Sequence, residues 1–348
     1  MNQALDQSKT AALSRKTTLR TIAVEEHFAT KAIGIVHGPG LDMSQMLEPD
    51  VRSAMLAKTD QLLDLGERRI SDMDEAGVDV QVLSLTRGLE GVEDENEAVG
   101  LARDSNDVLA DALRRYPSRF AGFAALPVWV PEKAADELER TVKEFGFKGA
   151  MIYGHSRGRY LDDKFFWPIL ARAEELNVPI YLHPTPPPEP VIKASYVGNY
   201  SRTVTGVLSA WGWGWHIETA VHVLRLILSG AFDVHPRLQL LIGHLGEALP
   251  FMMPRIEHAF PVQVTKLDRS VGDYLRENVH YSFSGWNYTP AFLNLLLQVG
   301  ADRIVFSADY PYQSMVEAVN FLEQLPVSPQ DKEKIAHGNA ERLLHLWH

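Results

Sequence analysis

The chain has 348 residues, and not one of them is cysteine. This absence excludes disulfide bonds, thiolate nucleophiles and metal sites built from thiolates. Any metal ion must therefore be held by nitrogen and oxygen atoms. The 13 histidines and the 45 aspartate and glutamate residues are the candidate ligands.

Long apolar runs are also absent. No run approaches the roughly 18 apolar residues that a membrane-spanning helix needs. The first 20 residues, MNQALDQSKTAALSRKTTLR, are polar and lack the apolar stretch of a signal peptide. We therefore expect a cytoplasmic protein without a membrane partner, in which residues 1–20 form a flexible N-terminal arm.

Positive charge is scarce too. Acidic residues outnumber the 34 lysine and arginine residues, and the net charge is −11. The chain would repel a phosphate backbone, because it contains no long basic run to attract one. Nucleic acid is therefore not an expected partner, and a small-molecule substrate is favoured.

What the chain does contain is a regular alternation of strand-like and helix-like segments. From Thr21 onward, short β-branched runs alternate with amphipathic stretches of helix length, a pattern typical of parallel β-α-β units. The eight predicted strands are Thr21–Val24, Val78–Leu85, Phe120–Leu126, Phe147–Tyr153, Val178–Leu182, Leu238–Ile242, Val279–Phe283 and Arg303–Ser307. The clearest predicted helices are Asp94–Arg115, Pro131–Phe145, Asp163–Leu176, Glu218–Ser229 and Pro290–Val299. No GxGxxG motif follows the first strand, so the pattern predicts an α/β fold with one closed (β/α)₈ TIM barrel over residues 21–348, not an open doubly wound sheet.

Two segments are too long for ordinary loops of such a barrel. One runs from Phe28 to Thr59 after the first strand, and the other from Pro184 to Trp215 after the fifth. The second combines PTPPPEP with the aromatic run WGWGW. These insertions either roof an active site or meet a neighbouring subunit. The WGWGW run could equally be plain packing of the loop against the barrel, and the sequence leaves these readings open.

Metal-competent side chains stand at the ends of four predicted strands. The segment VEEHF places Glu25 and His27 two residues apart, on one side of an extended chain. His183 follows the fifth strand, His244 the sixth and Asp309 the eighth. Each alone is more often a hydrogen-bonded core residue or a helix cap. The carboxyl ends of barrel strands converge on one mouth, however, so the joint placement indicates a metal site.

The remaining histidines lack comparable convergence in the sequence. His222 falls within a predicted helix and His235 precedes a proline, so both are assigned structural roles. His216 is set aside with them, whereas His155, just beyond the fourth strand, stays open.

The chemistry-bearing segments resemble a known family. The set Glu25-x-His27, His183-Pro184, Gly243-His244-x-Gly246-Glu247 and Asp309-x-Pro311-Tyr312 is similar to the aromatic acid decarboxylases of the metal-dependent amidohydrolase superfamily, which include γ-resorcylate, 2,3-dihydroxybenzoate and 5-carboxyvanillate decarboxylases. The resemblance covers nearly the whole chain from Thr21. The segments LLDLGERRISDMDEAGVD and GFKGAMIYGHSRGRYLDDKFF most resemble the 5-carboxyvanillate branch.

This resemblance implies specific roles for individual residues. It implies that one divalent ion, Zn²⁺ or Mn²⁺, is held without any organic cofactor by Glu25, His27, His183 and Asp309. His244 becomes an acid/base partner, and Arg255 binds the substrate carboxylate. Tyr312 and Arg69 become further substrate contacts, with Arg68 as an equally available alignment. Some of these contacts come from a second subunit, because members of the family form dimers or tetramers; a homodimer or homotetramer is therefore expected.

Two departures from the hydrolytic members of the superfamily favour one metal over two. Those members begin with His-x-His, whereas this chain has Glu25-Glu26-His27. They also use a lysine at the end of strand four to bridge two ions. Here Lys148 lies near the start of that strand, and Tyr153 occupies its end.

The implied reaction is non-oxidative decarboxylation of a hydroxylated aromatic acid. Direct cleavage would leave an unstabilised aryl anion, so the ring carbon is protonated first and rearomatisation then expels CO₂. An ortho hydroxyl bound to the cation supplies the electron density. We expect Asp309 to carry the proton and His244 to orient or recharge it. Glu247 either fixes His244 or is an ordinary first-turn helix carboxylate.

Two other functions remain open on the sequence alone. The same ligands permit a metal-dependent hydrolase or hydratase acting on a lactone or a related intermediate of aromatic catabolism. Arg255 and Tyr312 favour the decarboxylase, because it needs a carboxylate anchor and a wall for the ring. A barrel that only binds an aromatic ligand would leave the metal-competent set without a purpose.

Overall fold

The computed structural model describes residues 19–33, 47–89 and 92–346. Residues 1–18 of the predicted flexible arm (residues 1–20) therefore lie outside the described residues. Its last residue, Arg20, pairs with Glu341 at 3.0 Å.

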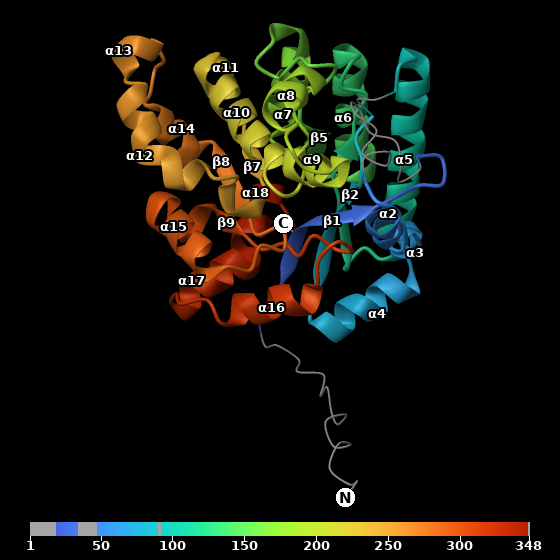
Figure 1. Cartoon of the computed structure of the whole chain (residues 1–348). Coiled ribbons are helices and arrows are strands. Elements are labelled where there is room, and N and C mark those ends of the chain that lie inside the picture. Colours follow the sequence, from blue (N-terminus) through green and yellow to red (C-terminus); the bar gives the residue numbers. More distant parts are fainter. Residues whose placement is uncertain (1–18, 34–46, 90–91, 347–348) are drawn as a thin grey trace, which may run out of the picture.

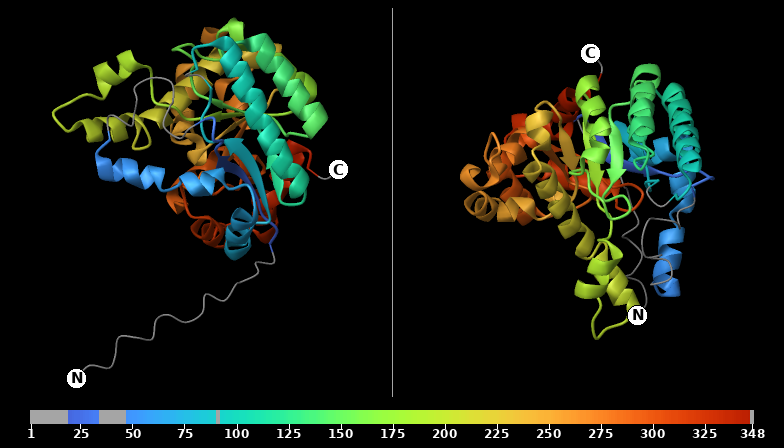
Figure 2. Two further views of the ribbon diagram at one scale, coloured as in Figure 1. Left: turned by 90° about the vertical axis from the view of Figure 1, so that its right-hand side faces the viewer. Right: turned by 90° about the horizontal axis from the view of Figure 1, so that it is seen from above.

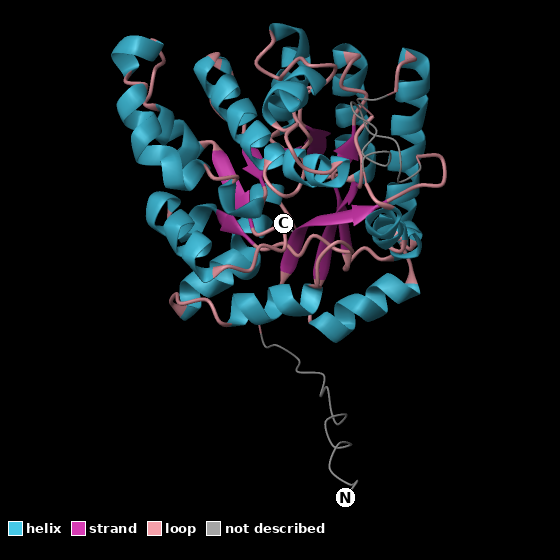
Figure 3. Cartoon of the chain, viewed as in Figure 1, coloured by secondary structure: helices cyan, strands magenta, loops and turns pink. Residues whose placement is uncertain are grey.

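Within these described residues, nine short parallel strands stand in the centre, and helices surround them (Figures 1 and 3). The strands are β1 (Ile22–Phe28), β2 (Val80–Leu85), β3 (Phe120–Gly122), β4 (Ala124–Ala125), β5 (Ala150–Tyr153), β6 (Ile180–His183), β7 (Leu240–Ile242), β8 (Val279–Ser282) and β9 (Ile304–Val305). Every predicted strand is present. The third is interrupted at Phe123, which divides it into β3 and β4.

The strands close into a barrel. Parallel pairing runs β1-β2-β3 and then β4 through β9 in chain order. Phe123 joins the two runs, because its N–H donates to Leu83 O at 2.9 Å and the next residue, Ala124, donates to Gly149 O at 2.8 Å. The ring closes where Val24 N–H donates to Phe306 O at 3.0 Å. The predicted (β/α)₈ barrel is confirmed.

Side chains on the strands alternate between two apolar clusters, as a strand period of two requires. Inward residues such as Val24, Tyr181 and Leu241 fill the barrel together with residues of the C-terminal helix, including Leu343. Outward residues pack against the helices. The barrel interior is thus a packed apolar core.

The helices follow the strands in order. They are α2 (Pro49–Leu56), α3 (Thr59–Leu63), α4 (Glu67–Ala76), α5 (Glu95–Arg115), α6 (Pro131–Phe145), α7 (Trp167–Leu176), α8 (Glu189–Ser195), α9 (Arg202–Ser209), α10 (Gly214–Leu228), α11 (Ala231–Val234), α12 (Leu249–Ala259), α13 (Val262–Thr265), α14 (Val271–Glu277), α15 (Thr289–Val299), α16 (Met315–Glu323), α17 (Pro329–Glu333) and α18 (Asn339–Leu344). α6 spans the predicted residues because proline starts it and Gly146, at φ 72°, ends it. α10 begins at Gly214, four residues before the predicted start.

The two predicted insertions lie side by side. The first contains α2 and the second contains α8 and α9, and both project from the same side of the barrel (Figure 2). Glu48 N–H, just before α2, donates to Thr203 Oγ1 in α9 at 3.0 Å. Within the described residues, none of the helices is long and apolar enough to cross a membrane.

Candidate metal centre and active-site cavity

The end of β1 presents Glu25 and His27 to the barrel mouth. Regular alternation would put Glu25 on the outward face with Ala23. The pairing of β1 with β2, however, shifts register between Ala23 and Glu26. An irregularity of this kind re-aims the side chains that follow it. Glu25 therefore points inward and contacts Tyr181 on β6.

Glu25 is fully buried and is held by only one of its oxygens. Its Oε2 accepts hydrogen bonds from the hydroxyls of Tyr181, Ser282 and Ser284. Its Oε1 has no hydrogen-bond partner among the described residues and lies 3.5 Å from His183 Nε2. Burial raises the pKa of Glu25, a cost that a bound cation would offset.

The two histidines offer ring nitrogens to the same point. His183 Nδ1 lies 2.9 Å from Pro184 O and donates to it, which leaves the Nε2 lone pair for a ligand. His27 Nδ1 lies 3.4 Å from Ser84 Oγ, and His27 Nε2 lies 3.1 Å from Asp309 Oδ1. Burial holds the pKa of His183 well below its ordinary value, so the ring is neutral, as a metal ligand must be.

Asp309 is positioned by Glu26, a residue that the sequence analysis did not single out. The Glu26 carboxylate accepts hydrogen bonds from Ala308 N–H at 2.7 Å and Tyr310 N–H at 3.1 Å, one on each side of Asp309. These bonds hold Asp309 in a left-handed conformation at φ 63°. Burial raises the pKa of Glu26 to about 8.

The donor set fits a divalent cation. The ligand atoms of Glu25, His27 and His183 lie within 4.8 Å of one another. Asp309, which follows β9, approaches His27. Ligand bonds of about 2.0–2.2 Å separate neighbouring ligand atoms by roughly 3–3.5 Å, close to the contacts observed here. Glu25 Oε1 and His27 Nε2 are also buried without hydrogen-bond partners among the described residues, as unsatisfied ligand atoms would be.

A second polar cluster stands beside the first and joins His244 to Glu247 and His216. Glu247 Oε1 lies 2.7 Å from His244 Nδ1, and Glu247 Oε2 lies 2.5 Å from His216 Nδ1. Burial would lower the pKa of His244, but the Glu247 carboxylate outweighs it and raises the pKa to about 9. These ring nitrogens are already engaged by Glu247, so this cluster is a hydrogen-bonded relay and not the better metal site.

His216 corrects the sequence analysis, which set it aside. It lies near the start of α10, directly after the WGWGW run, and it lines the same cavity as His244. No strand-end position identified it, because it reaches the site from the start of α10, just after the second insertion. The signal available in the sequence was its place beside that aromatic run.

A cavity of about 440 Å³ opens above the ligands. Its wall includes Trp211 and Trp215 of the second insertion, Trp286 after β8, and Tyr312 after β9. Trp213 is 53% exposed and does not line the cavity. Two tryptophans of the WGWGW run therefore wall the site, which decides between the two readings left open by the sequence.

Tyr312 and Tyr153 both belong to that wall. The Tyr312 hydroxyl lies 2.5 Å from Thr86 Oγ1, and its ring meets that of His27 at 5.5 Å. The Tyr153 ring lies 4.3 Å from that of His183. Lys148 instead reaches His345 O, away from the cavity. The absence of a bridging lysine among the cavity residues agrees with the one-metal interpretation.

Arg69 is placed differently from the expectation. Its guanidinium is fully buried and donates to His27 O at 2.7 Å, Asp64 O at 2.8 Å and Gln81 Oε1 at 3.2 Å. It does not line the cavity, so the predicted substrate contact is corrected to a support for the backbone of His27. Arg68 is exposed on α4 and does not line the cavity either.

Arg255 is exposed on α12 and lies outside the cavity of its own chain. Its predicted contact with the substrate carboxylate therefore stays a prediction and requires a second copy of the chain.

Comparison with known proteins agrees with this geometry. The chain is 39% identical over 347 residues to the γ-resorcylate decarboxylase of Polaromonas sp. strain JS666, across 93% of this chain and 98% of that protein. The structure of a dihydroxybenzoic acid decarboxylase from Polaromonas sp. JS666, with manganese and the inhibitor 2-nitroresorcinol, has a TM-score of 0.85 at 36% identity and covers 95% of this chain and 98% of its own.

A 5-carboxyvanillate decarboxylase from Novosphingobium aromaticivorans, complexed with manganese and 4-hydroxy-3-methoxy-5-nitrobenzoic acid, has a TM-score of 0.84 at 35% identity, over 94% of this chain and 97% of its own. The predicted resemblance is confirmed, but these values do not separate the branches, so the preference for the 5-carboxyvanillate branch stays a prediction. The amidohydrolase family matches residues 54–346, which is most of the chain. The chain belongs to the amidohydrolase family.

Proposed function

We propose that the protein is a metal-dependent decarboxylase of an aromatic acid that carries a hydroxyl ortho to its carboxylate. The observation that carries this proposal is the cluster of Glu25, His27, His183 and Asp309 at the floor of a cavity walled by aromatic rings. Relatives with decarboxylase names, including a fungal one 34% identical over 338 residues, support the same reaction.

One divalent ion is assigned to these four side chains. When bound, such an ion acts as a Lewis acid and orients the phenolic oxygen and the carboxylate of the substrate. Mn²⁺ is the first ion to test because two similar structures contain it, and Zn²⁺ suits the same nitrogen and oxygen donors.

The protein's own contribution to the reaction is the movement of one proton. The ring carbon that bears the carboxylate gains a proton, the bond to the carboxylate breaks, and CO₂ leaves while the bonding electrons return to the ring. Asp309 lies in the cavity wall and donates this proton. His244 engages Glu247 through Nδ1, which leaves Nε2 to return a proton to Asp309. Glu247 and His216 hold that imidazole in place.

The cavity wall positions the ring and excludes water. Trp215, Trp286 and Tyr312 present apolar faces to a planar substrate, and offset stacking or edge contacts stabilise such rings. A dry wall also strengthens the electrostatic interactions that the four ligand side chains make.

The anchor for the substrate carboxylate is assigned to Arg255 of a second copy of the chain. Phe251, one helical turn before Arg255 on α12, is 76% exposed, and Leu297 on the neighbouring α15 is 84% exposed. α12 and α15 pack against each other, and contiguous exposed apolar patches mark interaction sites. We therefore propose a homodimer or homotetramer in which α12 meets another subunit. The predicted cytoplasmic location stays a prediction.

The test compares two panels of substrates. Protein stripped of metal and reloaded with Mn²⁺ is incubated with ortho-hydroxybenzoates, including 5-carboxyvanillate and 2,6-dihydroxybenzoate, and with a set of lactones. Substrate loss is followed by chromatography, and CO₂ release is measured. The proposal expects CO₂ from at least one hydroxybenzoate. Hydrolysis of lactones without any CO₂ release would assign the site to the hydrolase alternative.

A further inference from the structure

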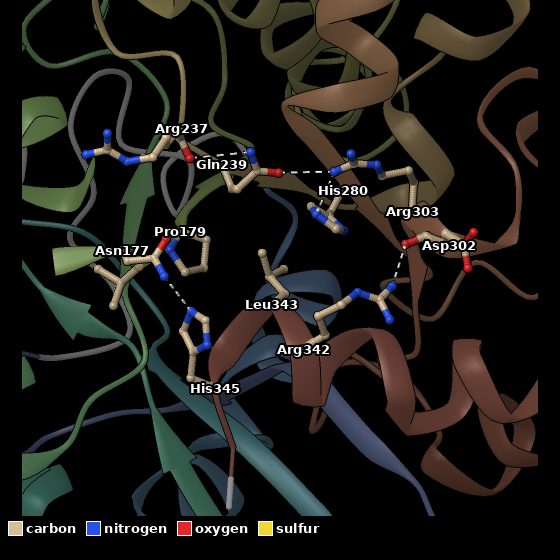
Figure 4. A pocket seen from close by; sticks show the side chains of 11 residues that line it. Asn177, Pro179, Arg237, Gln239, His280, Asp302, Arg303, Arg342, Leu343 and His345 are labelled. Carbon is tan, nitrogen blue, oxygen red and sulfur yellow. Dashed lines mark hydrogen bonds between the residues drawn. The ribbon is translucent and has the colours of Figure 1, made fainter. Parts of the chain in front are cut away.

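A second cavity, of about 530 Å³, lies at the opposite end of the barrel from the metal centre (Figure 4). Its lining residues precede or begin four consecutive strands: Pro179 before β6, Gln239 before β7, His280 in β8 and Arg303 before β9. α18 and the residue after it supply the remaining wall. The metal ligands stand at the other ends of the strands, so the two sites do not overlap.

The charge of this cavity is opposite to that of the whole chain. The chain carries a net charge of −11, yet this cavity gathers Arg237, Arg303 and Arg342. The one carboxylate in its lining, Asp302, is paired with Lys334 at 2.9 Å. Among the residues that the structure describes, no carboxylate lies within ion-pair distance of the three arginines.

Two of these arginines are held in place by neutral groups. Arg303 is half-buried, and its NH1 lies 3.1 Å from Gln239 Oε1 and 3.0 Å from His280 Nε2. Arg342 donates to Asn339 Oδ1 at 2.7 Å. Neutral acceptors fix the guanidinium groups without cancelling their charge, so both remain available to an anion.

His280 supplies an unpartnered donor in the same wall. The side chain is only 6% exposed, and its Nε2 accepts from Arg303. A neutral imidazole whose Nε2 accepts carries its hydrogen on Nδ1. That Nδ1 is buried and has no hydrogen-bond partner among the described residues. His280 therefore fixes the Arg303 guanidinium in the wall without neutralising its charge.

We propose that this cavity binds a small organic phosphate ester through Arg303 and Arg342, with Arg237 at the rim. A phosphate group offers several charged oxygens to separate donors, whereas one arginine already satisfies a single carboxylate. Cavities of this size hold small organic ligands rather than a bare ion, and Val178, Pro179 and Leu343 give the wall an apolar part. The proposal is independent of the reaction assigned to the metal centre.

The test is calorimetric titration of the full-length, Mn²⁺-loaded protein in a buffer free of phosphate and sulfate. The probes are adenosine monophosphate, ribose 5-phosphate, inorganic phosphate and succinate. We expect at least one ester to bind with one site per chain, more tightly than inorganic phosphate or succinate, and more weakly as sodium chloride rises. Equal binding of succinate would overturn the choice of phosphate, and equal binding of inorganic phosphate would overturn the choice of an ester.

Two variants locate the binding. Arg342→Ala, at an exposed position, and Arg303→Met should each weaken ester binding at least 10-fold. The matched control is Arg114→Ala, which removes the same charge from an exposed arginine on α5 and should leave binding unchanged. Turnover at the metal centre should persist in all three. The proposal is overturned if neither ester binds. It is also overturned if Arg342→Ala binds the ester as tightly as the parent and the Arg114→Ala control do.

Discussion

The two ends of the barrel carry opposite chemistry on the same strands. At the carboxyl ends, Glu25, His183 and Asp309 present oxygen and nitrogen lone pairs suited to a cation. At the amino ends, Arg303 just before β9 and Arg342 on α18 beside it present guanidinium groups suited to an anion. The apolar interior cluster separates them. Strand direction therefore sorts the charges: a residue's place along its strand decides which ligand it can meet.

The largest expected effect comes from the carboxylate at the mouth. Asp309→Asn removes both a metal ligand and the proposed proton donor, so kcat should fall by a factor of about 10³ or more. The matched control at the other end is Asp302→Asn, an exposed carboxylate paired with Lys334, which should leave kcat unchanged. Steady-state kinetics with the best hydroxybenzoate measures both. An equal loss of kcat in the two variants would contradict the assignment of catalysis to the carboxyl ends of the strands alone.

The next largest effect is expected from Glu26, which positions Asp309 at the barrel mouth. Glu26→Gln replaces one accepting oxygen with an amide that faces a backbone N–H, either that of Ala308 or that of Tyr310. Asp309 should then shift, and kcat should fall about 10- to 100-fold, as for other residues that support metal ligands. Glu218→Gln is the control, because Glu218 is a buried carboxylate that accepts from Tyr160, outside the cavity lining. A loss in the control as large as in Glu26→Gln would remove the positioning role.

A smaller effect is expected from adding a methyl group beside the three hydroxyls that donate to Glu25, those of Tyr181, Ser282 and Ser284. A Cβ on Gly243 would lie 2.4 Å from Ser284 Oγ, 3.1 Å from Tyr181 OH and 3.2 Å from Glu25 Oε2. Gly243→Ala should therefore weaken Mn²⁺ binding about 10-fold and lower the free energy of unfolding by about 1–3 kcal/mol.

The control for this variant is Gly100→Ala within α5, where a Cβ meets nothing within 4 Å. That change should stabilise the protein by about 0.5–1 kcal/mol and leave Mn²⁺ binding unaltered. Urea unfolding and Mn²⁺ titration measure both variants. Unchanged Mn²⁺ affinity in Gly243→Ala would contradict the prediction that these contacts hold Glu25 in the position that the ion requires.

The smallest effect concerns pH and the amino-terminal end. Burial, followed by the charges of Arg303 and Arg342, lowers the pKa of His280 to about 3. The unfolded chain therefore binds this proton below about pH 6.5 while the folded chain does not, so His280 lowers stability as pH falls from about 6.5 toward 3. His280→Gln removes the titration and should flatten the dependence by about 1 kcal/mol per pH unit. Urea unfolding at pH 7 and pH 5 measures it, and parallel curves for parent and variant would contradict it.

The fold was predictable because each strand and helix carries its own local signal. Each of the eight predicted strand segments contains an observed strand, and proline and glycine marked both ends of α6. The convergence of the four predicted ligands, Glu25, His27, His183 and Asp309, was predictable for the same reason, since strand ends converge in any barrel.

Other parts of the site depend on geometry that sequence spacing does not carry. Alternation alone would turn Glu25 away from the barrel, and only the register shift in β1 brings it in. Glu26 lies between two ligands, yet acts on the backbone around Asp309. His216 reaches the site from the start of α10, and the Arg69 guanidinium donates to backbone carbonyl groups inside the fold. Each of these contacts joins segments whose distance in space is set by loops rather than by strand order.

The most direct measurement is the stoichiometry and affinity of Mn²⁺ binding to metal-free protein by calorimetric titration, in the parent and in Glu25→Gln. Four side chains around one point predict one ion per chain, with binding in the variant weakened at least 10-fold although the fold is retained by circular dichroism. Two ions per chain, or equal affinity in parent and variant, would contradict a single centre built on Glu25, His27, His183 and Asp309.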